Sequence, residues 1–232
     1  MRKPPTRREL ILGAGTGAVV LATVGCEKTT TQVPELEVTP TEDLMREHGI
    51  LARVLGVYTA SATRLAAGDR SVLAAVRGAA DIARDFVEGY HERIEERFVF
   101  PRFEAAKQLP ELITTLRHQH EAGRGLTAAI AARARGGLIK DADRDVLVAA
   151  LRGYVAMFEP HVAREDTIVF PLLKRLAGRD YHALGEIFEA EEEQHFGKDG
   201  FELYVAMLPE LEIGAGVADL STFTVEAVTL SV

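Results

Sequence analysis

The feature that most constrains the fold is a short motif that the chain contains twice. The motif is a His, a Glu four places on, a second acid, and then Val-Phe-Pro. It stands at His91-Glu-Arg-Ile-Glu95-Glu96-Arg-Phe-Val-Phe100-Pro101 and again at His161-Val-Ala-Arg-Glu165-Asp166-Thr-Ile-Val-Phe170-Pro171. Four residues turn a helix by about 400°, so each His and its Glu project from the same face, one turn apart. An imidazole and a carboxylate placed in this way form half of an inward-facing metal site between helices.

Two further histidines extend the repeat. Leu44-Met-Arg46-Glu47-His48 is echoed by Leu116-Arg117-His118-Gln119-His120. The order along the chain is therefore His, His-x-x-x-Glu, His, His-x-x-x-Glu. This order suggests two helix pairs related by a pseudo-two-fold axis, with two metal ions between them.

The apolar residues predict four helices that surround one core. They advance by three and four positions, as on one face of a helix, through four stretches that run from 44 to 65, 76 to 98, 113 to 130 and 147 to 172. A histidine stands midway in each stretch. An aromatic content of 6% and the absence of Trp also favour helix over sheet. We therefore expect an all-α, up-and-down four-helix bundle within residues 42–207.

Signals for helix ends and breaks divide the rest of the chain. Thr41 before two acids is the expected N-cap of the first helix. Pro101 and Pro171 are expected to end or kink their helices. Residues 183–207 predict an additional, acidic C-terminal helix. Residues 208–232 form a tail whose end, from Thr222, alternates like a strand, so it is expected to be irregular or β-like.

Six polar side chains interrupt the apolar stretches, and buried charges need a partner. Arg93, Arg97 and Arg164 fall on other faces, so metal cations are the natural partners, with neutral His and ionised Glu as ligands. Two ions bridged by the two carboxylates would use all six. The predicted ligands are His48, His91, Glu95, His120, His161 and Glu165. The single cysteine excludes Cys-based zinc sites, and a His/carboxylate set suits iron, manganese or zinc.

Each of these residues has a simpler interpretation. A lone histidine in a core is more often a hydrogen-bonded structural residue than a ligand. Glu96 is read as a solvated acid or as one that supports a ligand. Asp166 is a rival to Glu165, because a local widening of the helix would bring it inward. The remaining histidines are expected on the surface or in packing contacts: His118, His182 and His195.

The N-terminal residues predict export. Residues 1–26 combine four basic residues with a short apolar stretch, and Arg7-Arg8 resembles the twin-arginine signal. Thr23-Val24-Gly25-Cys26 resembles a bacterial lipobox, although Thr23 replaces the usual Leu. Cys26 would then carry a lipid that tethers the protein to a membrane of the periplasm or cell envelope. The Thr/Pro-rich residues 27–41 are expected to be a linker. A formal charge of −8 argues against nucleic-acid binding.

On these motifs the chain resembles the hemerythrin-like family, in particular its bacterial HHE cation-binding branch. The similarity covers about residues 42–177, and the additional helix resembles that branch's C-terminal extension. The resemblance implies a four-helix bundle with a non-haem di-iron centre held by the six residues named above. It also implies a small ligand such as O2.

The chain departs from the oxygen-carrying hemerythrins in one respect. Those have two histidines four apart on the third helix, whereas Leu116 and Arg124 stand four residues before and after His120 here. One fewer histidine leaves an open position on the metal. Three functions follow as alternatives: binding or sensing of oxygen or a related small ligand, or iron handling; a di-iron oxidase or peroxidase; and a metal-free structural domain. The first is preferred, so a binding protein is expected rather than an enzyme.

Overall fold

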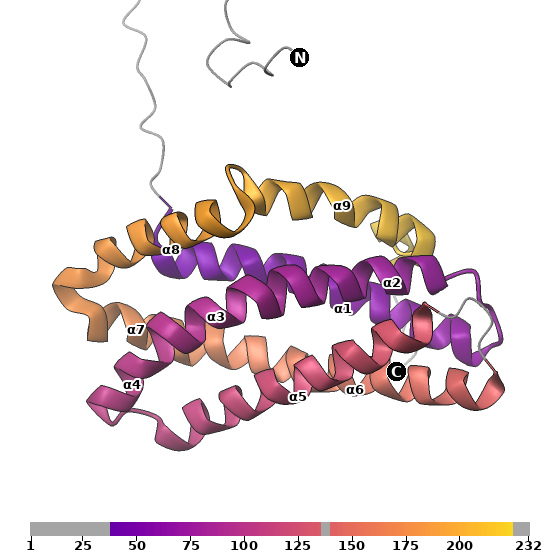
Figure 1. The fold of residues 1–232 in the computed structure, drawn as a ribbon, viewed down its shortest axis with the longest axis horizontal. Coiled ribbons are helices and arrows are strands. Elements are labelled where there is room, and N and C mark those ends of the chain that lie inside the picture. The colour runs from indigo at the N-terminus through magenta and orange to yellow at the C-terminus, as the bar shows by residue number, and fades with distance from the viewer. Residues whose placement is uncertain (1–37, 136–139, 225–232) are drawn as a thin grey trace, which may run out of the picture. The chain divides into compact units, whose positions relative to one another are not determined.

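A computed structural model describes residues 38–135 and 140–224, and these residues are helical nearly throughout, with no strand among them. Four long helical segments follow one another along the chain (Figure 1). The first is α1 (Pro40–Ala66). The second is a continuous run of α2 (Leu73–Ile82), η1 (Ala83–His91), α3 (Glu92–Ile94), η2 (Glu95–Val99) and α4 (Phe100–Ala106). The third is α5 (Pro110–Ala134), and the fourth joins α6 (Asp141–Arg164), η3 (Glu165–Val169) and α7 (Phe170–Ala177).

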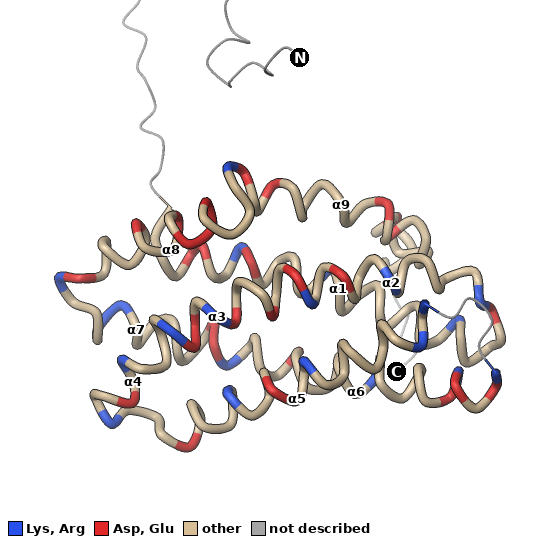
Figure 2. Tube along the Cα trace, in the orientation of Figure 1, with Lys and Arg blue, Asp and Glu red and all other residues tan. Residues whose placement is uncertain are grey.

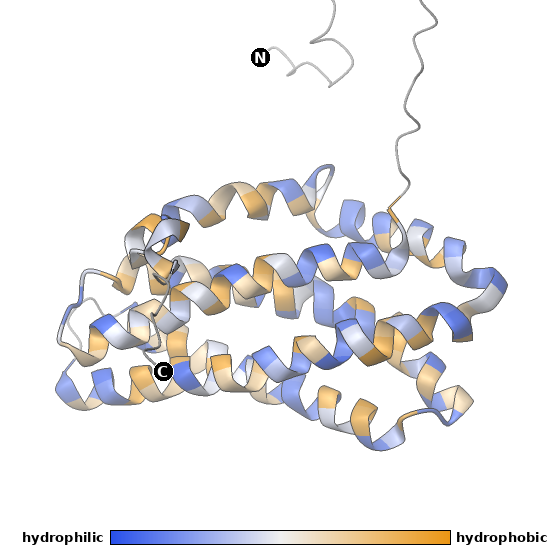
Figure 3. Ribbon diagram, turned by 180° about the vertical axis from the view of Figure 1, so that it is seen from behind, coloured by the Kyte–Doolittle hydropathy of each residue, from blue (hydrophilic) through white to orange (hydrophobic). Residues whose placement is uncertain are grey.

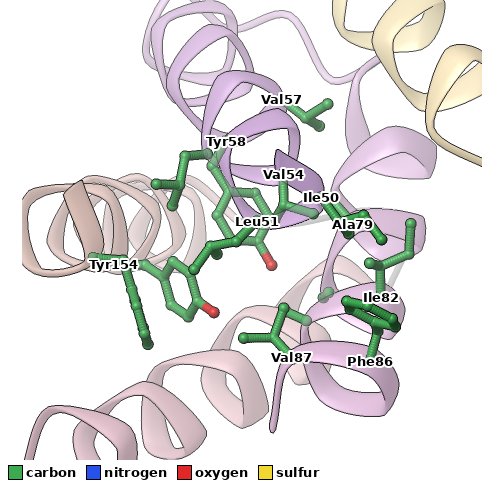
Figure 4. Close-up of a cluster of buried hydrophobic side chains, with 14 of the residues drawn as sticks. Ile50, Leu51, Val54, Val57, Tyr58, Ala79, Ile82, Phe86, Val87 and Tyr154 are labelled. Carbon is green, nitrogen blue, oxygen red and sulfur yellow. The ribbon is translucent and has the colours of Figure 1, made fainter. Parts of the chain in front are cut away.

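These four segments enclose the core as a closed ring. α1 contacts both α2 and α6, and α5 contacts both α2 and α6. Figure 3 shows polar and apolar residues alternating along each helix, and the apolar ones face inward. Figure 4 shows Tyr58 of α1 and Tyr154 of α6 meeting in this core, with their ring centroids 5.3 Å apart. The predicted all-α class is confirmed.

The first helix begins earlier than predicted. Thr39, not Thr41, is its N-cap, and Pro40 occupies the first turn. Thr39 and Glu42 form a capping box, in which each side chain hydrogen-bonds the backbone N–H of the other. Thr41 instead bonds the Tyr181 hydroxyl at 2.6 Å, so its side chain joins two helices rather than capping one.

Three stretches of the second and fourth segments are π-helix, in which the backbone turn is widened by one residue. Two of them, η2 and η3, begin at Glu95 and Glu165, which are matching positions of the repeated motif. Pro101 and Pro171 follow directly, in the first turn of α4 and α7. Both segments continue past their proline, which directly follows the widened turn of η2 or η3.

The C-terminal region differs from the prediction. One helix over 183–207 was expected, but two are present: α8 (Tyr181–Phe196), which follows the short turn η4 (Gly178–Asp180), and α9 (Gly200–Ala215). Gly197 and Asp199 adopt positive φ angles of 80° and 63°, so the helical conformation is interrupted between α8 and α9. α9 also continues through Pro209, beyond the predicted start of the tail. Pro209 is exposed, while Leu208 and Ala215 are buried.

The two C-terminal helices cover one side of the ring. α9 lies along α1 and α2, and α8 lies against α1 (Figure 1). Arg53 of α1 donates two hydrogen bonds to Glu212 of α9, at 2.6 and 2.7 Å. Acidic residues recur along α8 (Figure 2). A short turn, η5 (Leu220–Phe223), follows α9. Thr222 and Phe223, the first residues of the stretch expected to be strand-like, lie in this turn instead. The rest of that stretch from residue 225, the export signal and most of the linker lie outside the described residues.

Candidate metal centre

The structure brings all six predicted ligands together at one depth of the ring. Each comes from one of the four long segments, and none is more than 3% exposed: His48 (α1), His91 (η1), Glu95 (η2), His120 (α5), His161 (α6) and Glu165 (η3). The rings of His48 and His91 lie with centroids 4.7 Å apart, and those of His120 and His161 lie 5.0 Å apart. The histidines therefore form two pairs.

Each glutamate lies between two histidines that belong to different pairs. Glu95 Oε2 is 3.6 Å from His91 Nε2 and 3.4 Å from His120 Nε2. Glu165 Oε2 is 3.5 Å from His48 Nε2 and 3.0 Å from His161 Nε2. All four Nε2 atoms consequently face the same interior space as the two carboxylates. Two groups of potential ligand atoms share Glu95, and within each group the atoms lie within 4.8 Å of one another. One group adds His48 and His91, and the other adds His120, His161 and Glu165.

The other ring nitrogen, Nδ1, of each histidine is held by a polar group from a neighbouring segment. These contacts measure 2.7 Å for His48 to Asp166, 2.6 Å for His91 to Glu47, 3.0 Å for His120 to Glu96 and 2.9 Å for His161 to Gln119. Such outer hydrogen bonds fix the orientation of a ligating imidazole and leave its second nitrogen free for a metal.

The outer contacts obey the same two-fold repeat as the ligands. Glu96 and Asp166 each stand five residues after the histidine of their own motif, and each holds a histidine of the next segment. Glu47 and Gln119 each precede the first histidine of their half. The sequence analysis did not assign a role to Glu47 or Gln119. Their shared position before His48 and His120 was the available signal.

The π-turns explain the placement of the second acid in each motif. Because the backbone widens from Glu95 and from Glu165 onward, the following acid is turned toward the adjacent segment. Asp166, considered as a rival ligand, is about one third exposed and contacts Nδ1 of His48 on its outer side. Glu165 is the residue that faces the interior. Glu96 contacts Nδ1 of His120 in the matching way. This agrees with one of its two interpretations from the sequence, an acid that supports a ligand.

The Val-Phe part of the motif also has a structural role. Phe170 stacks on His48 and Phe100 stacks on His120, each with ring centroids 5.4 Å apart. Both phenylalanines are fully buried. Each motif therefore covers one imidazole of a neighbouring segment with an apolar ring, which keeps water away from it.

Burial and charge oppose one another at these residues. Burial disfavours a charged imidazole, but the hydrogen bond to Asp166 and the nearby carboxylate of Glu165 raise the pKa of His48 to about 10. The pKa of His120 rises to about 10 by the same opposition, with Glu95 and Glu96 as its acidic partners. At His91 burial outweighs the nearby Glu95 and Glu165 and lowers its pKa to about 4. Burial opposes ionisation of Glu165 as well, yet the adjacent His161 and His48 lower its pKa below the usual range.

The interior carboxylates fit a cation. No hydrogen bond from the described residues reaches either oxygen of Glu95 or Glu165, or Nε2 of His48, although all are buried. Buried polar atoms are almost always satisfied, so orphaned donors and acceptors that face one another call for a partner between them. Imidazole nitrogen and carboxylate oxygen are the ligands of iron, manganese and zinc.

The remaining histidines lie apart from this cluster. His118, His182 and His195 are exposed. His195 packs edge-on against Phe196, with ring centroids 4.5 Å apart. Their predicted place on the surface or in packing contacts agrees with the structure.

Comparisons with known proteins agree with this geometry. A sequence profile described as the Hemerythrin HHE cation binding domain matches residues 39–173. The chain is also 39% identical over 230 residues to "Uncharacterized protein Rv1995" of Mycobacterium tuberculosis and to "Uncharacterized protein Mb2018" of Mycobacterium bovis. Each alignment covers 94% of this chain and 90% of the relative. No solved structure matches the chain. On the profile match and the buried His/Glu cluster, the chain belongs to the hemerythrin HHE cation-binding domain family.

Proposed function

We propose that the chain forms an up-and-down four-helix bundle that holds two non-haem iron ions and binds dioxygen or a related small ligand. The observation that carries the proposal is that each interior glutamate lies between one histidine of each pair. Two cations can share both carboxylates in this arrangement, whereas a single ion would leave part of the set without a partner.

The roles of the residues follow from their positions. His48 and His91 would hold one ion, His120 and His161 the other, and Glu95 and Glu165 would bridge them. Two iron ions held in this way supply electrons for redox exchange and coordination positions for a small ligand. The protein itself contributes oriented imidazoles and two apolar covers, Phe100 and Phe170, that exclude water.

The test is metal analysis combined with spectroscopy. We expect apoprotein given Fe(II) without oxygen to retain two iron ions per chain, and to develop an oxo-bridged di-ferric absorption when air is admitted. The double variant His91→Leu/Glu95→Leu should lose both the iron and the absorption while it remains helical. Iron-free protein after this treatment would contradict the proposal.

A second candidate function is turnover of oxygen or peroxide. Neither residue four positions from His120 supplies a ligand: Leu116 is an apolar core residue, and Arg124 is paired with Glu92 and Glu96 at 2.8 and 2.7 Å. An open coordination position favours reaction over reversible carriage. Steady-state consumption of oxygen or peroxide with a reductant would identify an oxidase or peroxidase, and stoichiometric binding without consumption would identify a binding protein.

We also propose that the protein is exported by the twin-arginine signal at residues 1–26 and is tethered through a lipid on Cys26. Exporting a folded protein would allow metal to be loaded in the cytoplasm. Fractionation of cells that express the variant Arg7→Lys/Arg8→Lys tests the first step, and this variant should stay in the cytoplasm. The variant Cys26→Ala should move from the membrane fraction to the soluble one.

A further inference from the structure

The two halves of the centre match closely, but one buried acid has no counterpart. The residue after His91 is Glu92, and the matching residue after His161 is Val162. Glu92 is only 1% exposed, and neither of its oxygens accepts a hydrogen bond from a described residue. None of the four outer contacts to Nδ1 uses Glu92, so the orientation of the imidazoles does not explain it. A buried carboxylate needs a positive partner, and Arg124 supplies one at 2.8 Å.

Glu92 belongs to a third group of potential ligand atoms. Oxygens of Glu92 and Glu96 and a nitrogen of His120 all lie within 4.8 Å of one another. Nδ1 of His120 faces this group, at 3.0 Å from Glu96 Oε1, while its Nε2 faces the bridging Glu95. His120 therefore has one nitrogen on each side. When cations bind on both sides, the Nδ1 proton must leave to solvent and the ring becomes an imidazolate.

The guanidinium of Arg124 lies beside these three potential ligand residues. Arg124 Nη2 lies 2.8 Å from Glu92 Oε2 and 2.7 Å from Glu96 Oε1, and only the second contact has hydrogen-bond geometry. The matching position of the other half, four residues after His48, is Ala52. The acid and its cationic neighbour are thus both additions to one half of the repeat.

The group is open to solvent on one side. Glu96 is 26% exposed and Arg124 is 37% exposed, whereas Glu92 and His120 are buried. A surface pocket of about 410 Å³ borders Glu96 and Arg124, and Arg84, Glu88, Gly89 and Arg93 complete its lining. The long side chain of Arg124 has room to swing into this pocket. Its departure would leave two carboxylates and an imidazole nitrogen facing one space.

We propose that Glu92, Glu96 and Nδ1 of His120 form a loading site for a divalent cation at the rim of the centre, and that Arg124 occupies this site until a cation displaces it. This inference rests on the proposed function, because a loading site is useful only if it passes cations to the two-ion centre. His120 connects the two sites. Two carboxylates and one imidazole form a ligand set suited to Fe(II), Mn(II) or Co(II).

Cobalt(II) is the probe, because its visible absorption reports binding and coordination without oxidation. Stopped-flow mixing of the full-length apoprotein with cobalt(II) would follow loading, and equilibrium titration would give the number of ions bound. The variants are Glu92→Gln and Arg124→Gln. Glu121→Gln is the matched control, since Glu121 is an exposed acid beside His120 that lies outside both sets of ligands.

We expect Glu92→Gln to slow loading by at least about tenfold while the final occupancy of two ions stays unchanged. Arg124→Gln should bind one ion more than the wild-type chain, with a distinct absorption spectrum. Glu121→Gln should behave as wild type in both measurements. Either a Glu92→Gln chain that loads at the wild-type rate or an Arg124→Gln chain that binds no additional ion would overturn the loading site.

The same titrations separate this inference from the proposed centre. If the wild-type chain binds no cobalt(II) but Arg124→Gln binds one ion, the loading site stands and the two-ion centre falls. Should Glu92→Gln fail to fold, the stoichiometry of Arg124→Gln decides the question alone, because Arg124 is partly exposed and its loss leaves no cavity in the core.

Discussion

At the scale of single residues, the centre depends on outer partners as much as on its six inner side chains. The two halves use different chemistry at one matching position: Glu47 holds His91, and Gln119 holds His161. Both place an oxygen against Nδ1, so both select the same imidazole tautomer. Only Glu47 adds a buried acidic group, and burial raises its pKa to about 8.

This difference gives a matched pair of substitutions at Glu47. Glu47→Gln should leave metal affinity nearly unchanged, because an amide oxygen already performs this task in the other half. Glu47→Leu removes the oxygen that holds His91 and should weaken metal binding by about 10–100-fold. Competition against a chromophoric chelator measures both affinities. Equal losses in the two variants would show that the charge of Glu47, rather than its hydrogen bond, is what matters.

The raised histidine pKa values predict how metal binding depends on pH. In the metal-free protein, protonated His48 and His120 stabilise the fold below their ordinary pKa of 6.5, and this stabilisation is lost as the pH rises through about 10. A metal needs the neutral imidazoles, so at neutral pH it must displace these protons. We therefore expect metal affinity to increase with pH between 6 and 8. Calorimetry in two buffers of different ionisation enthalpy would detect the released protons, and a heat independent of the buffer would contradict the assignment.

At the scale of helices, the sequence predicted the segments better than their internal geometry. Spacings of three and four found all four long segments and placed a histidine midway in each. The same spacings ran straight through the π-turns at Glu95 and Glu165, because a widened turn leaves no clear mark in an apolar pattern. The outer partners were missed or left open for a related reason: Glu47 and Asp166 act on histidines of other helices, and a single helix pattern does not give the register between helices.

Two glycines of α5 provide a test of packing against helix propensity. A Cβ on Gly123 would lie 2.7 Å from the buried ring of Phe158, which in turn packs on His161. A Cβ on Gly125 would meet nothing within 4 Å. Gly125→Ala should therefore stabilise the protein by up to about 1 kcal/mol. Gly123→Ala should destabilise it by about 1–3 kcal/mol.

Chemical denaturation of the metal-free proteins measures both changes without interference from metal binding. Since the two residues share one helix and one substitution, the propensity gain is common to both. A Gly123→Ala protein as stable as Gly125→Ala would mean that Phe158 moves aside readily. The close approach of α5 and α6 at Gly123 would then be unimportant for the centre.

At the scale of the whole molecule, the meeting of the six interior side chains could be predicted because their pattern occurs twice in the chain, and two copies rarely agree by chance. The C-terminal region offered no such repeat. Its break at Gly197 and Asp199 was overlooked, and the helix through Pro209 forms because tertiary burial of Leu208 and Ala215 outweighs the effect of one proline.

Removing the two C-terminal helices should destabilise the ring that they cover. A chain that ends at Asp180 loses the buried Phe188, Tyr204 and Leu208 and exposes the faces of α1 and α2 beneath them. We expect its Tm to fall by well over 4 °C, since loss of several buried side chains removes several kcal/mol. A chain that ends at Phe223 keeps both helices and is the control. Equal Tm values for the two chains would show that α8 and α9 are dispensable covers.

The outer contacts have one more consequence when they are followed around the molecule. His48 reaches the fourth segment through Asp166, His161 reaches α5 through Gln119, His120 reaches the second segment through Glu96, and His91 returns to α1 through Glu47. The four links form a closed belt at the depth of the centre. A helix that slid or rotated would break two links at once, so the belt resists such movement even before any ion arrives. An ion that changes its charge would then meet a frame already set, which keeps the structural rearrangement that accompanies electron transfer small.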